Sequence, residues 1–113
     1  MTVTTFALVQ HVQTAAGTQV VYTVPAGLRA VVFDVRTYNW DTAVHTINVT
    51  AVASSPGGAS FVLQKSTALA ANTGTASGVI RTAMNAGDFI EVSLDVAAST
   101  TPIAVWVSGQ QYS

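Results

Sequence analysis

The stretch Phe89-Ile90-Glu91-Val92-Ser93-Leu94-Asp95-Val96 carries the clearest structural pattern in the chain. Its side chains alternate strictly, with Ile90, Val92, Leu94 and Val96 on one side and Glu91, Ser93 and Asp95 on the other. Successive side chains of a β-strand point to opposite faces of a sheet, so this alternation predicts a strand with one buried and one wetter face. Such a strand is typical of an antiparallel sheet that is covered on one side.

The same alternation recurs upstream. Ile47, Val49 and Ala51 oppose Thr46, Asn48 and Thr50, and we expect Val31, Phe33 and Val35 to oppose Asp34 and Arg36. Short segments rich in Val and Thr, separated by turns such as Pro25-Ala26-Gly27 and Asn85-Ala86-Gly87, predict eight strands. They cover residues 4–13, 18–24, 29–39, 45–53, 60–65, 77–84, 88–96 and 102–112. Residues 66–76 contain the one helix candidate, at 68–71, and are predicted to form a long loop or crossover.

The strand spacing predicts an all-β fold, an eight-stranded antiparallel β-sandwich with jelly-roll connectivity. An immunoglobulin-like sandwich is the alternative. That fold normally carries a cysteine pair beside a core Trp, and the chain has no cysteine, although many such sandwiches lack the pair. The length of 113 residues predicts a single β-sandwich domain over 1–113.

The composition excludes several classes of protein. Half of the residues are apolar and only 8% are charged, which argues against a disordered chain. Four basic residues and a net charge of −1 argue against nucleic acid as a partner, because phosphate neutralisation needs several Lys or Arg on one face. The absence of cysteine excludes disulfides, thiolate-bound zinc and thiol catalysis.

The chain shows no targeting or membrane signal. Its first six residues, Met1-Thr2-Val3-Thr4-Thr5-Phe6, contain no basic residue and begin no long apolar run, so we expect no signal peptide. No stretch reaches the ~18 uninterrupted apolar residues of a membrane helix, so we expect no membrane partner.

Catalytic and metal-binding motifs are missing. His11 and His45 are the only histidines, lie far apart, and are expected to be polar or half-buried strand residues rather than metal ligands. Neither a G-x-S-x-G elbow nor a phosphate-binding glycine loop occurs. The carboxylates are expected to be solvated or turn-forming: Asp34, Asp41, Asp88, Glu91 and Asp95. The sequence therefore predicts no enzyme, catalytic residue, cofactor or metal.

The predicted surface carries unusually little charge. A two-sheet sandwich exposes about half of its strand side chains, which here are mostly Thr, Ala, Ser, Gln and Asn. Sheet edges of free monomers are commonly protected by charge, especially Lys, and Lys65 is the only lysine. We therefore predict that the chain self-associates or is covered by neighbours; the alternative is a soluble monomer with a Thr-rich face.

Three aromatic residues are candidate assembly or ligand contacts. Trp106 lies on the opposite side of its strand from Ile103, Val105 and Val107, which predicts an outward orientation. Tyr38 and Trp40 share the parity of Asp34 and Arg36, so we expect both rings to face outward as well. We also expect Asp34 and Arg36 to form an ion pair on this surface. Exposed Trp and Tyr anchor many protein interfaces and also form platforms for sugars. The alternative is that each aromatic ring caps an end of the sandwich or packs under a loop.

Two segments resemble small virion proteins of tailed bacteriophages. The first is Tyr22-Thr23-Val24-Pro25-Ala26-Gly27-Leu28-Arg29-Ala30-Val31-Val32. The second is Asn85-Ala86-Gly87-Asp88-Phe89-Ile90-Glu91-Val92, followed by Ile103-Ala104-Val105-Trp106-Val107-Ser108-Gly109. The resemblance implies a β-sandwich or jelly-roll structural protein that decorates the capsid, often as a trimer, or serves in a tail, neck or fibre.

These observations lead to an expected function. The chain is expected to be a non-enzymatic head decoration or cement protein that binds the capsid exterior and stabilises the shell. Its partners would be the major capsid protein or other virion proteins and copies of itself, as a homotrimer, in a virion assembled in the host cytoplasm. The alternatives are a tail, neck or fibre component, or a carbohydrate-binding module that recognises a receptor through Trp106, Trp40 and Tyr38.

Overall fold

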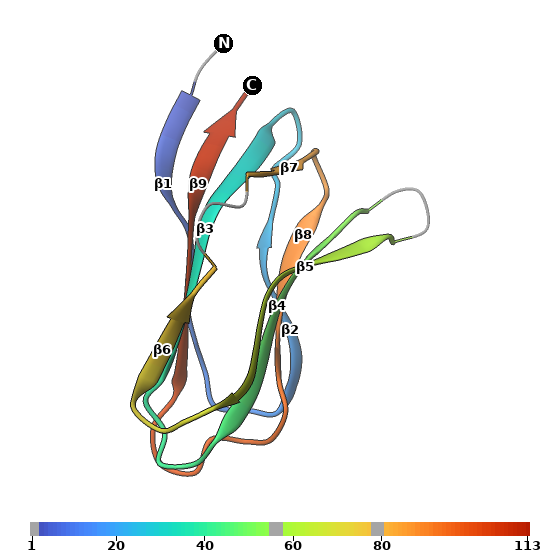
Figure 1. Ribbon diagram of the computed structural model, residues 1–113. Helices are drawn as coiled ribbons and strands as arrows, with labels where there is room; N and C mark the ends of the chain where they lie inside the picture. The colour runs from blue at the N-terminus through green and yellow to red at the C-terminus, as the bar shows by residue number, and fades with distance from the viewer. Residues whose placement is uncertain (1–2, 55–57, 78–80) are drawn as a thin grey trace.

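The computed structural model describes residues 3–54, 58–77 and 81–113, which form two antiparallel sheets packed face to face (Figure 1). The strands in this part of the chain are β1 (Val3–Gln13), β2 (Gly17–Thr23), β3 (Arg29–Asn39), β4 (His45–Val52), β5 (Ser60–Leu69), β6 (Thr73–Ala76), β7 (Thr82–Met84), β8 (Phe89–Leu94) and β9 (Ile103–Tyr112). No helix within these ranges is long and apolar enough to span a bilayer.

The connectivity is that of a jelly roll. One sheet has the order β1-β9-β3-β6, with β7 also paired to β3, and the other has the order β2-β8-β4-β5. The pairs β1–β9, β2–β8 and β4–β5 are nested in the sequence, as if one long antiparallel ribbon had been rolled into two layers. This arrangement confirms the predicted sandwich and its jelly-roll connectivity, in place of the immunoglobulin-like alternative. The described residues form nine strands instead of the predicted eight, because β6 and β7 are separate strands that pair with different parts of β3.

The core lies between the sheets and follows the predicted alternation in β4 and β8. Ile47 and Val49 from β4, and Ile90, Val92 and Leu94 from β8, are almost fully buried. Burying each such side chain contributes roughly 1.5–3 kcal/mol, so these two central strands supply much of the apolar stabilisation. The inward residues of β9 complete the opposite wall of the same core.

The predicted parity of β3 is wrong at its first half. Val31 and Phe33 are only half-buried, whereas Val32 and Val35 are completely buried. The pairing of β3 with β9 shifts register between Val32 and Asp34, which marks a β-bulge. One extra residue in a strand moves every following side chain to the other face, so a single alternation could not describe this strand.

Residues 66–76 form strands rather than the predicted loop. β5 continues to Leu69, and β6 begins at Thr73. The hydroxyl of Thr75 lies 2.8 Å from those of Thr37 and Ser66, so small polar side chains satisfy one another where the two sheets meet. Composition favoured a loop because Ser and Thr are common in turns, but here their hydroxyls are paired inside the fold.

Two further strand predictions need correction. The predicted strand 77–84 is reduced to β7, and its residues 78–80 lie outside the described part of the chain. Val96, predicted on the buried face, is exposed because β8 ends at Leu94 and Asp95 turns toward His45.

The turns Pro25-Ala26-Gly27 and Asn85-Ala86-Gly87 form two equivalent corners that lie side by side. Gly27 has φ +79° and Gly87 has φ +88°, values that favour glycine. The amide of Gly87 donates to the carbonyl of Val24 at 3.0 Å, which joins one corner to the other. The similarity of the two turns in the sequence therefore reflects paired corners of the sandwich.

Candidate functional site

The three candidate aromatic residues lie on or beside the outer face of the β1-β9-β3-β6 sheet. Trp106 projects from β9 and is 49% exposed, and Trp40, just after β3, is 54% exposed. Tyr38 is half-buried, and its ring centroid lies 4.3 Å from that of Trp40, with the planes tilted by 41°. The predicted outward orientation of Trp106 and Trp40 is confirmed; their role in assembly or ligand contact stays a prediction.

A groove runs over this face because large and small side chains are neighbours in the strand register. Trp106 pairs across strands with Arg36, while Tyr38 is opposite Ala104 on β9 and Gly74 on β6. Ala104 and Gly74 leave space beside the larger side chains, and the resulting groove has a volume of about 680 Å³. Among the described residues that line the groove, Asp34 and Arg36 are the acidic and basic ones.

The groove walls are held in place by local contacts. Arg36 Nε donates to Asp34 Oδ2 at 2.8 Å, which confirms the predicted surface pair. The hydroxyl of Tyr38 donates to the carbonyl of Asn72 at 2.7 Å, so the ring lies across β6. A Cβ at position 74 would lie 2.7 Å from Tyr38 Cδ2, so Gly74 permits this placement of the ring.

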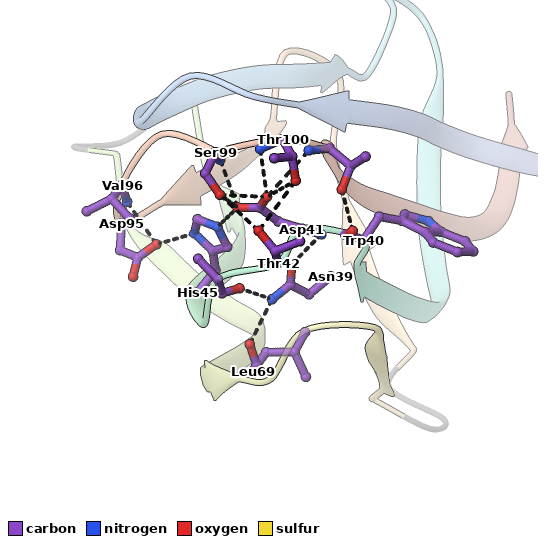
Figure 2. A network of polar contacts seen from close by, with 12 residues as sticks. Asn39, Trp40, Asp41, Thr42, His45, Leu69, Asp95, Val96, Ser99 and Thr100 are labelled. Atoms are coloured by element: carbon purple, nitrogen blue, oxygen red, sulfur yellow. Dashed lines mark hydrogen bonds and ion pairs between the residues drawn. The ribbon is translucent and has the colours of Figure 1, made fainter.

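A buried network of polar contacts lies on the inner side of the Trp40 turn (Figure 2). Asp41 is fully buried and accepts hydrogen bonds from the amides of Ser99 and Thr100, both at 2.9 Å, and from their hydroxyls at 3.0 and 3.1 Å. The expectation that Asp41 is solvated is therefore wrong. The turn that contains it folds inward because the loop after β8 supplies donors that replace water.

His45 joins this network to a second carboxylate. Its Nε2 lies 2.7 Å from Asp41 Oδ2 and its Nδ1 lies 3.1 Å from Asp95 Oδ1. An ionised carboxylate only accepts hydrogen bonds, so both contacts are satisfied when the imidazole carries a proton on each nitrogen. His45 is completely buried at the start of β4, which corrects the expectation of a half-buried strand residue. His11, by contrast, lies on β1, and its Nε2 is 3.0 Å from Oε1 of Gln13.

The ionisation of these groups follows from their contacts. Burial lowers the pKa of His45, but the hydrogen bonds and charges of Asp41 and Asp95 outweigh it, so the pKa lies above its ordinary value. The hydrogen bond from His45 holds the pKa of Asp41 far below its usual range, with further help from the Ser99 amide. Burial raises the pKa of Asp95, but hydrogen bonds from Thr46 and His45 lower it more. The shifts agree with the geometry, in which an imidazole protonated on both nitrogens lies between two carboxylates.

The network fixes the turn that presents Trp40. The side-chain amide of Asn39 donates to the carbonyls of Ala43 and Leu69 at 2.8 and 2.9 Å, and its oxygen accepts the amide of Asp41 at 2.9 Å. The Thr101 hydroxyl donates to the carbonyl of Trp40 itself. Figure 2 shows the indole directed away from these contacts. The turn that carries Trp40 is therefore held by hydrogen bonds on its inner side.

The contacts of His45 engage both of its ring nitrogens. Both nitrogens of His45 already face carboxylates, and within the described ranges no group of His, Asp and Glu side chains is arranged to hold a metal ion.

Asp88 has the turn-forming role expected of it. Burial raises its pKa, but the amides of Ser54 and Asn85 lower it further, and the pKa falls below its ordinary value.

The outer strands of both sheets are almost uncharged. The edge strands are β1, β6 and β7 in one sheet and β2 and β5 in the other, and within them Lys65 is the single charged residue. Apolar side chains take the place of charges, with Phe61 on β5 62% exposed and Val62, Val20 and Val12 also exposed. In Figure 1 the ribbon formed by the end of β4 and the start of β5 extends beyond the two packed sheets.

Comparison with known proteins identifies the fold. No protein-family model and no curated protein sequence matches the chain. Among solved structures, the chain is similar to one from the structure of infectious bursal disease virus, Gx strain, with a TM-score of 0.52 and 11% sequence identity. The match covers 97% of this chain and 30% of the viral chain, so the present chain spans less than a third of the length of the viral chain. At this identity the likeness concerns the fold.

Proposed function

We propose that the chain is a non-enzymatic structural protein of a virus particle, and that it acts as a head decoration protein of a tailed bacteriophage. It would bind the outside of the assembled capsid and bridge neighbouring capsid subunits. Because it would bind the assembled lattice better than free subunits, it would stabilise the shell by mass action.

The weakly protected sheet edges carry this proposal. Unpaired edge strands readily pair with another chain unless charge, proline or a covering element prevents it. The five edge strands of the described residues offer one lysine, Lys65, and expose Phe61, Val62, Val20 and Val12. Burial of apolar surface contributes about 25 cal/mol per Å², so these positions favour a covered state over a free one.

The jelly-roll fold supports the same reading. A chain in the structure of a virus shares it over 97% of the present chain, and the phage-like segments run in order along the sequence. Symmetric self-association, as a homotrimer, would bury the same edge strands on every copy and close into a ring. A small set of repeated contacts would then recur at every symmetry-related site of the shell.

Copy number and position in the purified particle test the proposal. We expect quantitative mass spectrometry to find many copies per particle and electron cryomicroscopy to place them on the capsid exterior. Shells stripped of the protein should break at a lower temperature, and addition of the purified protein should restore their heat resistance. A few copies confined to the tail would overturn the decoration role in favour of a tail, neck or fibre component.

A further inference from the structure

We propose that the groove beside Trp106 is a binding site for a neutral saccharide, with a sugar ring on the indole and its hydroxyls at Arg36 and Asp34. This function is additional to particle assembly. It uses the outer face of the β1-β9-β3-β6 sheet, whereas the assembly proposal depends on the exposed apolar residues of β1, β2 and β5.

The shape of the groove suits a small ligand. Its volume of about 680 Å³ lies within the ~300–1,000 Å³ of typical small-molecule sites. The floor is made by small residues, Ala104, Gly74 and Ala76, and Trp106 stands above it. An indole is a broad apolar surface that favours the C–H-rich face of a sugar ring. One or two sugar units therefore match both the space and its largest wall.

The charges of the groove favour a neutral ligand. Asp34 and Arg36 neutralise each other across 2.8 Å, so their pair offers no net charge to an anion or a cation. The guanidinium has donors beyond Nε, and the carboxylate has a second oxygen. Adjacent hydroxyls of a sugar both donate and accept, so they can bond to each member of the pair without breaking it.

The same pair disfavours an apolar protein surface as the occupant. The side chain of Arg36 is 70% exposed and that of Asp34 is 26% exposed, so both are hydrated. Covering them with an apolar partner removes that water, and desolvation of an ion pair commonly exceeds its Coulombic gain. Asp is accordingly depleted at the cores of protein interfaces. Sugar hydroxyls hydrogen-bond to the pair in place of the lost water and so offset this cost.

The Tyr38 wall of the groove is held before any ligand binds. Tyr38 is fixed by its hydrogen bond to Asn72 and by contact with Gly74. This ring has little freedom left to lose on binding, and such preorganisation raises affinity.

Tryptophan fluorescence tests the proposal directly, because Trp40 and Trp106 are the only tryptophans. The Trp40→Phe variant leaves Trp106 as the sole reporter. It would be titrated with maltose, cellobiose, lactose and N,N′-diacetylchitobiose, and the fluorescently labelled full chain would be screened on an array of neutral and acidic glycans. We expect at least one neutral saccharide to change Trp106 emission saturably, with a Kd near the millimolar range, about −4 kcal/mol.

Matched variants separate a binding site from a general surface effect. We expect Trp106→Ala to abolish binding on the array and Arg36→Ala to weaken it at least about tenfold. Val44→Ser, which alters an exposed apolar residue outside the groove lining, should bind as the unmodified chain does, and thermal unfolding would show that each variant is folded.

Three results of the binding experiments would overturn the proposal. They are no response to any neutral glycan, binding of acidic glycans alone, or unchanged binding by Trp106→Ala. A change in Trp106 emission on dilution of the protein without sugar would also overturn it, because a second copy would then cover the groove. Loss of sugar binding in Trp106→Ala with normal attachment to capsids would separate this proposal from the structural one.

Discussion

Replacement of His45 by alanine tests the buried charge cluster most sharply. His45 donates from Nε2 to Asp41 at 2.7 Å and from Nδ1 to Asp95 at 3.1 Å. The variant removes both donors and leaves the enclosed carboxylate of Asp41 without its cation. We expect a large loss of stability, with the sandwich still formed at low denaturant, because the apolar core is untouched.

The size of the effect follows from the contacts. A hydrogen bond to a charged group contributes about 1.5–3 kcal/mol, and removing one partner of a buried ion pair costs about 3–5 kcal/mol. The whole free energy of unfolding of a domain is only about 5–15 kcal/mol. We therefore expect His45→Ala to lower the melting temperature by roughly 10–20 °C.

The pKa shifts of the cluster determine whether the stability of the protein rises or falls with pH. The pKa of folded His45 is raised above the ordinary value of 6.5, so its contribution is full below about pH 6.5 and is lost as the pH rises through the folded pKa. The lowered pKa values of Asp41 and Asp95 act in the opposite direction, with stability present above their ordinary 3.8 and lost in acid. Within the described residues, these two are the ionisable side chains that hydrogen-bond to His45.

Urea unfolding, followed by tryptophan fluorescence between pH 6 and pH 9, measures both effects. The unmodified chain should lose stability toward pH 9, and His45→Ala should be less stable at pH 6 and flatter over the same range. His11→Ala, at the other histidine, is the control and should retain the alkaline loss of stability. An equal pH slope in the unmodified chain and in His45→Ala would refute the imidazolium assignment.

Three further predictions concern packing, a turn and an edge. Gly109→Ala should cost about 1–3 kcal/mol or more in urea unfolding, because its Cβ would lie 2.2 Å from the carbonyl oxygen of Val31. Asp88→Ala should cost about 1 kcal/mol near neutral pH, since the carboxylate accepts the amide of Asn85 at 2.8 Å. That cost should vanish in acid, because the lowered pKa of Asp88 places its contribution above pH 3.8. Phe61→Ser should weaken self-association in sedimentation velocity with little change in unfolding.

Neighbouring variants serve as controls for these three predictions. Ser108→Ala precedes Gly109 and should change stability by less than about 0.5 kcal/mol. Glu91→Ala removes a carboxylate from the outer side of β8 and should show a similarly small effect. Val44→Ser alters an exposed apolar side chain away from the edge strands and should leave self-association unchanged. Equal effects in a variant and its control would contradict the corresponding contact.

The alternation in the sequence predicted the two central strands well, because β4 and β8 pair in a regular register with one face in the core. The jelly-roll connectivity was likewise predicted from the strand spacing. The segments that resemble phage virion proteins include the two paired corners, Pro25-Ala26-Gly27 and Asn85-Ala86-Gly87, where positive φ demands glycine. The resemblance thus falls partly on residues that the fold itself requires.

Other features depended on partners far away in the chain. The bulge in β3 arises from its pairing with β9, and no local alternation reveals it. Asp41 is buried because Ser99 and Thr100, 58 and 59 positions later, supply its hydrogen bonds. The one local signal was the spacing of Asp41 and His45, four residues apart across a turn. The outward orientation of Trp106 was predictable, but the groove beside it needed the register that sets Ala104 and Gly74 next to Tyr38.

Sedimentation equilibrium of the purified chain tests the central claim most directly. If copies of the chain cover the nearly uncharged edge strands, the protein should form a homotrimer at micromolar concentration, with three times the mass of one chain. A single species with the mass of one chain, persisting at millimolar concentration and binding no capsid, would contradict the account.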